Sequence, residues 1–157
     1  EELLDNFQKY KSLQSVSIRP RQATTILKKK IKNVNYILVD DDFYLRSLWM
    51  LKAEEENINL RPYASFTDFL SDLSSISKDD VIFLDSQIDG EQFKGEDIGV
   101  KLFMKFGHKN LILQTGFDST LYDDYKDYFI LVRNDKTFIN MKDLNSILQT
   151  SKLRGVL

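Results

Sequence analysis

The pattern of hydrophobic and polar positions changes once along the chain. Residues 1–14 place apolar side chains at helical spacing with charged residues between them, which predicts an amphipathic helix. Residues 15–34 contain Pro20 and show little periodicity, which favours a linker. We therefore expect an N-terminal helix and linker over residues 1–34 and a single folded domain over residues 35–157.

The rest of the chain alternates short apolar runs with amphipathic segments. The runs predict buried strands at about residues 36–39, 58–63, 80–84, 111–114 and 129–132. The segments predict helices at about residues 43–56, 66–73, 96–106, 119–126 and 139–151. Ser65 is expected to cap the second of these helices. The inner face of the first is expected to carry Leu45, Leu48, Trp49 and the stem of Lys52.

This alternation is typical of one fold class. Strands that are apolar throughout are buried on both faces, and right-handed crossover helices connect parallel neighbours. The expected fold class is therefore α/β, a doubly wound five-stranded parallel sheet with helices on both faces.

Composition and charge exclude several classes of protein. The chain has 157 residues, 42% of them apolar and 29% charged, as in a soluble domain with a real core. Its net charge of −2 gives no long-range attraction to nucleic acid or to a membrane surface. The basic segment from Lys28 to Lys32 leaves such binding open locally, although a solvated linker is favoured. With no cysteine, disulfides, thiol catalysis and thiolate zinc sites are excluded.

The sequence contains no membrane-spanning segment and no targeting segment that would indicate where in the cell the protein is found. No apolar run approaches the ~18 residues of a membrane span, and no targeting segment is visible at the N-terminus. We expect a cytoplasmic domain with no nucleic-acid or membrane partner on this chain. A membrane-anchored parent protein remains compatible with the sequence.

Polar side chains follow four of the predicted strands: Asp40, Asp41, Asp42, Asp85, Thr115 and Lys136. The carboxyl ends of parallel strands meet at one edge of a sheet, which is where ligands bind in this fold class. Clustered carboxylates repel one another unless a cation such as Mg²⁺ neutralises them. A carboxylate can also accept a phosphoryl group when a metal, a hydroxyl and an ammonium group neutralise the phosphoryl oxygens. Taken singly, these residues are compatible with a helix cap, a turn hydroxyl and an exposed amine.

Four segments, in this order and spacing, resemble the receiver domain of two-component response regulators: residues 37–46, 81–85, 111–116 and 135–138. The resemblance covers about residues 35–151. It implies a flavodoxin-like fold with strand order 2-1-3-4-5.

The resemblance also implies roles for individual residues. Asp85 would be the phosphoacceptor, Thr115 would bond a phosphoryl oxygen, and Lys136 would pair with the carboxylate and then with the phosphate. Mg²⁺ would be held by Asp41 and Asp85, by Asp40 through a water, and by the backbone carbonyl of Gln87.

Three features depart from the family pattern. Thr137 stands where the family usually has proline, and Arg133 stands where an aromatic residue is common. An alignment with Arg133 in place of the lysine is the alternative to Lys136, which the Lys-x-Phe match favours. The segment 87–95 is longer than usual, and the acids in it or beside it are candidates to alter metal affinity: Asp89, Glu91 and Glu96.

The expected function is that of a phosphoacceptor receiver in a histidine-to-aspartate phosphorelay, with phosphorylation switching a protein-interaction face. The alternative is a degenerate receiver that binds proteins without phosphotransfer. The expected partner is a histidine kinase or a histidine phosphotransfer domain, with a second copy of the chain as a further candidate. His108 is expected to be an exposed loop residue, and the chain has no phosphate-cradling glycine motif, so no phosphodonor is visible. The C-terminal receiver of a hybrid sensor kinase is favoured over a stand-alone regulator.

Overall fold

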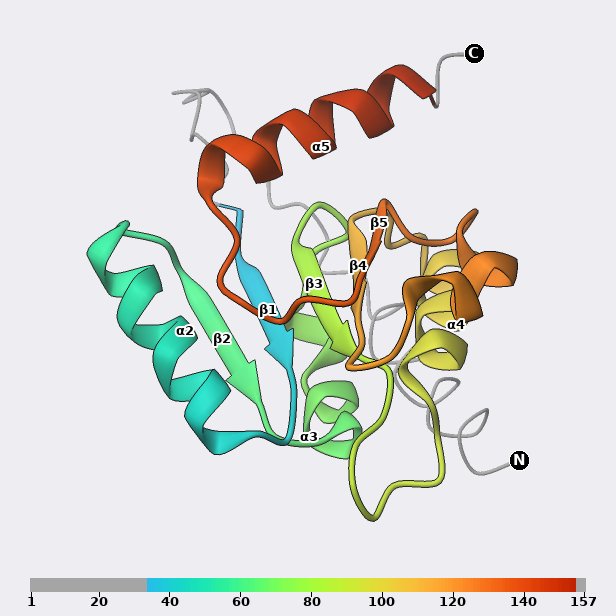
Figure 1. Cartoon of the computed structure of the whole chain (residues 1–157), viewed down its shortest axis with the longest axis horizontal. Coiled ribbons are helices and arrows are strands. Elements are labelled where there is room, and N and C mark those ends of the chain that lie inside the picture. The colour runs from blue at the N-terminus through green and yellow to red at the C-terminus, as the bar shows by residue number, and fades with distance from the viewer. Residues whose placement is uncertain (1–33, 155–157) are drawn as a thin grey trace, which may run out of the picture.

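The computed structural model describes residues 34–154, and the predicted N-terminal helix and nearly all of the linker lie outside the described residues (Figure 1). The strands are β1 (Tyr36–Val39), β2 (Leu60–Tyr63), β3 (Val81–Asp85), β4 (Leu111–Gln114) and β5 (Leu131–Arg133). The α-helices are α2 (Phe43–Glu55), α3 (Phe66–Ser71), α4 (Gly95–Phe106) and α5 (Met141–Arg154). Two further segments are 3₁₀ helices, η1 (Leu73–Ser75) and η2 (Ser119–Tyr125). Among the described residues, no helix has both the length and the apolar character needed to cross a membrane.

The five strands form one parallel sheet in the order β2-β1-β3-β4-β5, which confirms the expected fold class and strand order. The arrowheads of β1, β2 and β3 in Figure 1 point toward the same edge of the sheet, and β4 and β5 run parallel to them. The residues that follow the strands are therefore brought together at this edge, which we call the carboxyl edge.

Helix boundaries follow from local capping. Asp42 caps α2 by accepting hydrogen bonds from two backbone N–H groups of the first turn, and Ser65 caps α3 as expected. Gly107 ends α4 in the left-handed conformation that glycine adopts at little cost (φ 73°).

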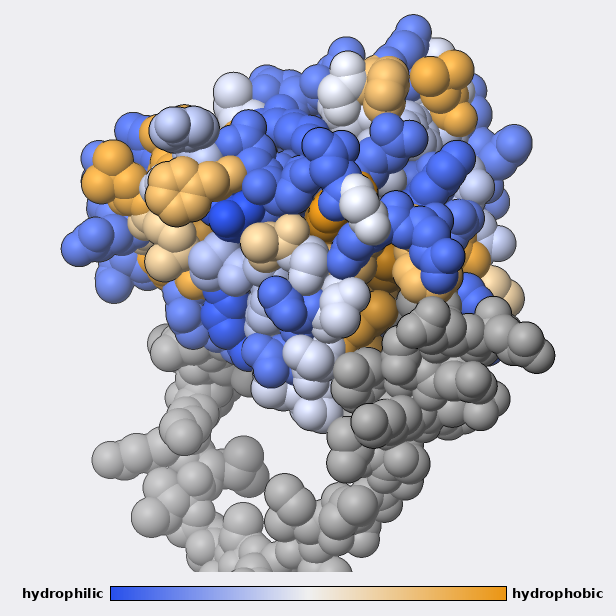
Figure 2. All heavy atoms as spheres, turned by 90° about the horizontal axis from the view of Figure 1, so that it is seen from below, coloured by the Kyte–Doolittle hydropathy of each residue, from blue (hydrophilic) through white to orange (hydrophobic). Residues whose placement is uncertain are grey.

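The inner face of α2 differs from the expectation. Leu48 is 46% exposed, whereas Trp49 and Ala53 are buried against the sheet. Apolar residues occupy nearly every position from Phe43 to Leu51, so the sequence marks no single stripe on this helix. Figure 2, which looks at the carboxyl edge, shows apolar side chains on the surface at the α2 end of the molecule.

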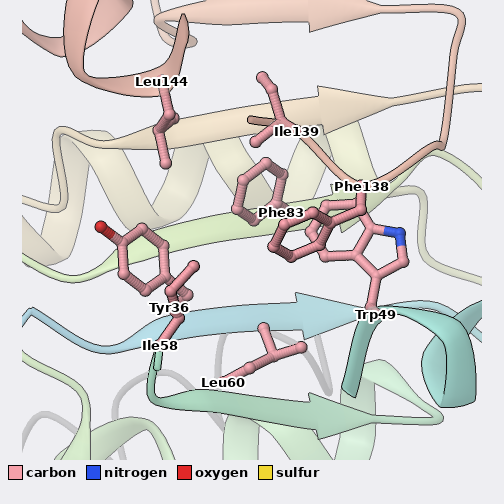
Figure 3. Close-up of a pocket in the computed structure, with 8 residues that line it drawn as sticks. All are labelled: Tyr36, Trp49, Ile58, Leu60, Phe83, Phe138, Ile139 and Leu144. Carbon is pink, nitrogen blue, oxygen red and sulfur yellow. The ribbon is translucent and has the colours of Figure 1, made fainter. Parts of the chain in front are cut away.

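The core lies on both faces of the sheet. On one face, α3, α4 and η2 pack on alternate strand residues such as Ile37 and Leu84. On the other face, Trp49 packs edge-on against Phe83 and Phe138, with ring centroids 4.8 and 5.3 Å apart. Figure 3 shows these rings at one end of a small apolar pocket that Leu144 of α5 also lines.

The region before β5 is less regular than the sequence predicts. The expected helix at 119–126 is 3₁₀ helix with a kink at Tyr122, and β5 begins at Leu131 instead of Phe129. Phe129 is buried over α4, where a Cβ on Gly99 would lie 2.1 Å from its ring. The side chain of Phe129 therefore packs against the helix, and the strand starts after it.

Candidate functional site

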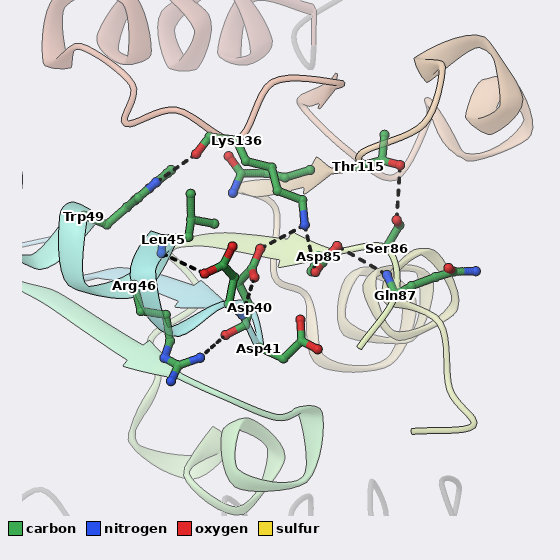
Figure 4. Close-up of polar contacts among 12 residues, drawn as sticks. Asp40, Asp41, Leu45, Arg46, Trp49, Asp85, Ser86, Gln87, Thr115 and Lys136 are labelled. Atoms are coloured by element: carbon green, nitrogen blue, oxygen red, sulfur yellow. Dashed lines mark hydrogen bonds and ion pairs between the residues drawn. The ribbon is translucent and has the colours of Figure 1, made fainter. Parts of the chain in front are cut away.

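Three consecutive acids at the end of β1 have three different environments. Asp40 is fully buried, and its Oδ1 accepts a hydrogen bond from the backbone N–H of Asp42 (2.9 Å). Asp42 is exposed and caps α2, whereas Asp41 is exposed at the carboxyl edge. Arg46 donates from Nη1 to the Asp40 carbonyl oxygen (2.8 Å) and fixes the turn between β1 and α2 (Figure 4).

The carboxylates of Asp40, Asp41 and Asp85 converge, because β1 and β3 are neighbouring strands that end at the same level. One oxygen of each lies within 4.8 Å of one oxygen of the others. We call these three residues the acid group. It is the one set of at least three potential metal ligands in the part of the chain that the structure describes.

Lys136 enters the acid group from the loop after β5. Its Nζ lies 3.1 Å from Oδ2 of Asp40 and 2.9 Å from Oδ2 of Asp85 (Figure 4). Burial lowers the pKa of Lys136, but its hydrogen bonds and charge interactions with the two acids outweigh this and raise the pKa above its ordinary value. The alternative alignment is wrong, because Arg133 contacts neither acid but the side chain of Gln114 and the loop at Thr137.

Asp85 is the most perturbed carboxylate of the acid group. Burial raises its pKa to about 6, which the negative charge of Asp40 reinforces and the contact with Lys136 opposes. The backbone N–H of Gln87 also donates to its Oδ1 (3.3 Å), while the Gln87 side chain is exposed. A cation beside Asp85 would favour its charged form and so lower this pKa.

Thr115 is fully buried directly after β4. Its hydroxyl oxygen accepts hydrogen bonds from Ser86 Oγ (3.2 Å) and from the backbone N–H of Phe117 (3.0 Å), and it lies 3.1 Å from the Tyr122 hydroxyl. The sequence analysis did not identify Ser86 and Tyr122, because neither residue belongs to a motif or a periodic pattern that would indicate a contact with Thr115. Thr115 therefore lies at the carboxyl edge, and its hydroxyl contacts Ser86, Phe117 and Tyr122.

The long segment after Asp85 is pinned across the carboxyl edge. The backbone N–H of Asp89 donates to Oδ2 of Asp41 (3.1 Å), and Glu91 accepts from the backbone N–H of Phe66 (2.9 Å) at the start of α3. Glu91 therefore caps a helix, and Asp89 contacts the acid group through its backbone. Neither these two residues nor Glu96, which lies buried at the start of α4, belongs to the acid group. Their expected influence on metal affinity stays a prediction.

His108 is buried, which corrects the expectation of an exposed loop residue. It is 1% exposed, and its Nδ1 has no hydrogen-bond partner. Burial lowers its pKa below the ordinary value of 6.5, and nearby Lys78 adds to this while Asp80 opposes it. Nothing in the sequence around His108 signals that the turn after α4 folds inward.

His108 is expected to make the folded domain less stable as the pH falls below 6.5. Above this pH the imidazole is neutral in both states and has no effect. Below it the unfolded chain takes up the proton first, so the free energy of unfolding falls until the pH drops through the lowered pKa of the folded state. Urea unfolding between pH 7.5 and 5, compared with His108→Gln, measures this at ~25 °C. Asp85 titrates in both proteins and cancels, and parallel curves would contradict the expectation.

The chain resembles solved structures in fold although no protein family and no curated protein matches its sequence. The response regulator TrrA from Thermotoga maritima, in complex with Mg(2+)-BeF, is 17% identical; the match covers 75% of this chain and 98% of TrrA, with a TM-score of 0.57. A CheY-like receiver domain from Methylobacillus flagellatus is 19% identical, with 75% and 98% covered and a TM-score of 0.58.

A third similar structure is the chemotaxis response regulator CheY4 of Vibrio cholerae. It is 16% identical, with 75% of this chain and 98% of CheY4 covered and a TM-score of 0.56. At these identities the likeness concerns the path of the backbone and the sheet order. The described part of this chain therefore has the fold of response regulator receiver domains.

Proposed function

We propose that this chain is a phosphoacceptor receiver that takes a phosphoryl group on Asp85. The observation that carries the proposal is the Lys136 ammonium, held within 3.1 Å of two buried carboxylates beside the exposed Asp41. Buried acids that share one lysine are costly to maintain for stability alone, since apolar residues of the same volume often stabilise a core as well. Such an arrangement is typical of a functional site that binds a charged ligand or transfers a charged group.

The acid group fits a hard divalent cation. Three carboxylate oxygens that lie within 4.8 Å of one another provide the ligand type that Mg²⁺ prefers. Burial and the charge of Asp40 disfavour the charged form of Asp85, and a bound cation would offset both. We propose Asp40, Asp41, Asp85 and the carbonyl of Gln87 as the residues that hold it. When bound, Mg²⁺ would neutralise charge on the carboxylates and on phosphoryl oxygens.

Three residues of the chain have separate roles in the proposed phosphoryl transfer. An oxygen of Asp85 attacks phosphorus, an O–P bond forms as the N–P bond to a donor histidine breaks, and the imidazole leaves with the electron pair and takes up a proton. Lys136 is placed to transfer its contact from the carboxylate to a phosphoryl oxygen. We propose that the Thr115 hydroxyl donates its proton to another phosphoryl oxygen. A change in its contact with the Tyr122 hydroxyl would then link phosphorylation to η2.

The surface beside the acid group supports a protein donor, a histidine kinase or a histidine phosphotransfer domain. Phe43 and Tyr44 are 65% and 83% exposed in the first turn of α2, directly after Asp42. Exposed aromatic side chains at the rim of a site are typical of protein interfaces. The competing proposal, a degenerate receiver, is favoured by Thr137 and Arg133, which replace residues of the family pattern.

Acetyl phosphate with Mg²⁺, followed by intact mass spectrometry, tests phosphotransfer. We expect one phosphoryl adduct on the wild type and none on Asp85→Ala. Asp89→Ala is the matched control, because this exposed acid lies beside the site and contacts it only through its backbone. An unmodified wild type would favour the degenerate receiver, and an adduct on Asp85→Ala would assign the phosphoryl group elsewhere.

Mg²⁺ is expected to stabilise the wild type more than Asp41→Asn. Binding to the native state alone adds RT ln(1 + [L]/Kd), which is about 1.4 kcal/mol at ten times Kd, or a few degrees in melting temperature. Asp41→Asn removes one ligand charge and one repelling charge, so the metal-free protein becomes more stable and its Mg²⁺ response smaller. Asn can still accept the Asp89 N–H bond. Thermal melts decide it, with Thr115→Ala as the variant that keeps the full response; equal shifts in wild type and Asp41→Asn would contradict a shared site.

A further inference from the structure

The loop that carries Lys136 lacks the hydrogen bonds that normally fix a backbone. Within the described part of the chain, no backbone–backbone hydrogen bond involves residues 134–139. The peptide bond between Lys136 and Thr137 is trans, as are all those of residues 34–154. Side chains must therefore hold this loop in place.

Arg133 supplies three of these side-chain contacts, and a further one runs from the backbone N–H of Thr137 to Oδ1 of Asp135 (2.8 Å). Its Nη1 donates to the Thr137 carbonyl oxygen (2.9 Å) and to Oε1 of Gln114 (3.1 Å). Its Nη2 donates to the Thr137 hydroxyl (3.5 Å) and lies 3.8 Å from a carboxylate oxygen of Asp135. The Arg133 side chain is only 13% exposed. One guanidinium thus contacts Asp135 and Thr137, the residues before and after Lys136.

Trp49 provides a further side-chain contact to the loop. Its Nε1–H donates to the carbonyl oxygen of Lys136 (2.9 Å), as Figure 4 shows. The ring of Trp49 is locked between Phe83 and Phe138, so this donor has a fixed position. The carbonyls of Lys136 and Thr137 are therefore each held by a side-chain donor on a rigid element.

Gln114 ties the same guanidinium to the sheet. It is fully buried, it pairs with Arg133 in the β4–β5 register, and it precedes Thr115 in the chain. The planar guanidinium reaches Gln114, Thr137 and Asp135 from two separate nitrogens, whereas the ammonium of a lysine presents all its donors from one nitrogen. The Arg133 side chain thus connects the loop of residues 134–139, which carries Lys136, to the end of β4 next to Thr115.

We propose that Arg133 is a positioning residue for Lys136, which clamps the loop so that the ammonium stays between Asp40 and Asp85. Arg133 and Thr137 then form a pair: a threonine leaves this loop freer than the proline that receiver-like sequences carry, and the guanidinium bond to the Thr137 carbonyl restores the constraint. The proposal rests on the proposed role of Asp85. It assigns Arg133 no contact with the acid group.

The test measures coupling between Arg133 and Lys136. Melting temperatures without Mg²⁺ are compared for the wild type, Arg133→Ala, Lys136→Met and the double variant. If Arg133 positions the ammonium, Lys136→Met lowers the melting temperature by less in the Arg133→Ala background than in the wild type. The matched control is Arg61→Ala, which removes a guanidinium that similarly bonds the hydroxyl and carbonyl of Ser75 far from the site. Its effect should add to that of Lys136→Met, and additive effects for Arg133→Ala as well would overturn the proposal.

A second measurement uses the rate of phosphorylation by acetyl phosphate. We expect Arg133→Ala to lower the maximal rate roughly tenfold to a hundredfold, as for a misplaced reacting group, and to leave the Mg²⁺ concentration at half-maximal rate within about twofold of wild type. Arg133→Lys should restore part of the rate, and Arg61→Ala should keep the full rate. An unchanged rate in Arg133→Ala, or a loss caused only by weaker Mg²⁺ binding, would overturn the proposal.

The two measurements separate failure of this proposal from failure of the proposed function. If the wild type accepts no phosphoryl group, the function fails, and the melting temperatures still decide whether Arg133 positions Lys136. If Arg133→Ala does not fold, Arg133→Lys replaces it in the double-variant comparison. This variant keeps a positive charge but loses the fork of hydrogen bonds to Thr137.

Discussion

Gly95→Ala is expected to lower the free energy of unfolding by about 3 kcal/mol, the upper part of the range for overpacking. A Cβ at this position would lie 1.8 Å from the carbonyl oxygen of Asp85. That oxygen belongs to the end of β3, so it cannot retreat without moving the Asp85 backbone. The backbone N–H of Gly95 also donates to the Ser86 carbonyl (2.9 Å), a bond that the same displacement would break. A thermal melt should show a loss of roughly 10 °C.

Gly116→Ala is the matched control for this substitution. Nothing lies within 4 Å of a Cβ at Gly116, and this exposed glycine also follows a strand at the carboxyl edge. Its effect should stay within about 0.5 kcal/mol, as for most surface substitutions. Similar losses in the two variants would show that the close approach of Gly95 to Asp85 is not what destabilises the protein.

Lys136→Met is expected to destabilise the metal-free protein by about 2 to 3 kcal/mol and to increase its response to Mg²⁺. The substitution leaves the buried carboxylates of Asp40 and Asp85 without their shared cation, and removing one partner of a buried ion pair is strongly destabilising. The lysine is 27% exposed, so water reaches the site and the loss falls below that of a fully buried pair. Mg²⁺ supplies positive charge to the same acids and should recover part of the stability.

Lys126→Met serves as the control, because it removes an ion pair with Asp123 in which both side chains are more than half exposed. Such a pair contributes at most about 1 kcal/mol. Chemical unfolding with and without Mg²⁺ measures both variants. If the Mg²⁺-induced stabilisation of Lys136→Met only equals that of the wild type, the lysine and the cation do not share the acid group.

The strands and the acids could be predicted from sequence because both leave local signals. Buried parallel strands are continuous apolar runs, and Asp40, Asp85 and Thr115 directly follow such runs. Lys136 lies further from its strand, and the resemblance to receivers was needed to select it over Arg133. The strand order also came from that resemblance, since alternation alone does not fix which strands are neighbours.

The remaining features depend on contacts between distant residues. Leu48 was placed inward because α2 has apolar residues nearly all round, and only the neighbouring sheet decides which side is buried. Burial of His108 depends on how its turn packs, which no periodicity records. The contacts of Arg133 and Trp49 with the lysine loop join residues that have no common motif, so Arg133 appeared in the sequence only as a departure from a pattern.

The hydrogen bond from the Gly95 N–H to the Ser86 carbonyl joins the two ends of the loop formed by residues 87–94. Residues added to this loop would cost little stability, because the entropy of loop closure rises only slowly with length. Gly90, at its exposed tip, has open space around it and a left-handed backbone (φ 79°). The next residue toward Asp85, Asp89, touches Asp41 through its N–H. A fluorescent label or a short inserted peptide at this tip would therefore be close in the chain to the acid group, so Gly90 is a suitable attachment point for an optical readout of the proposed Mg²⁺ binding.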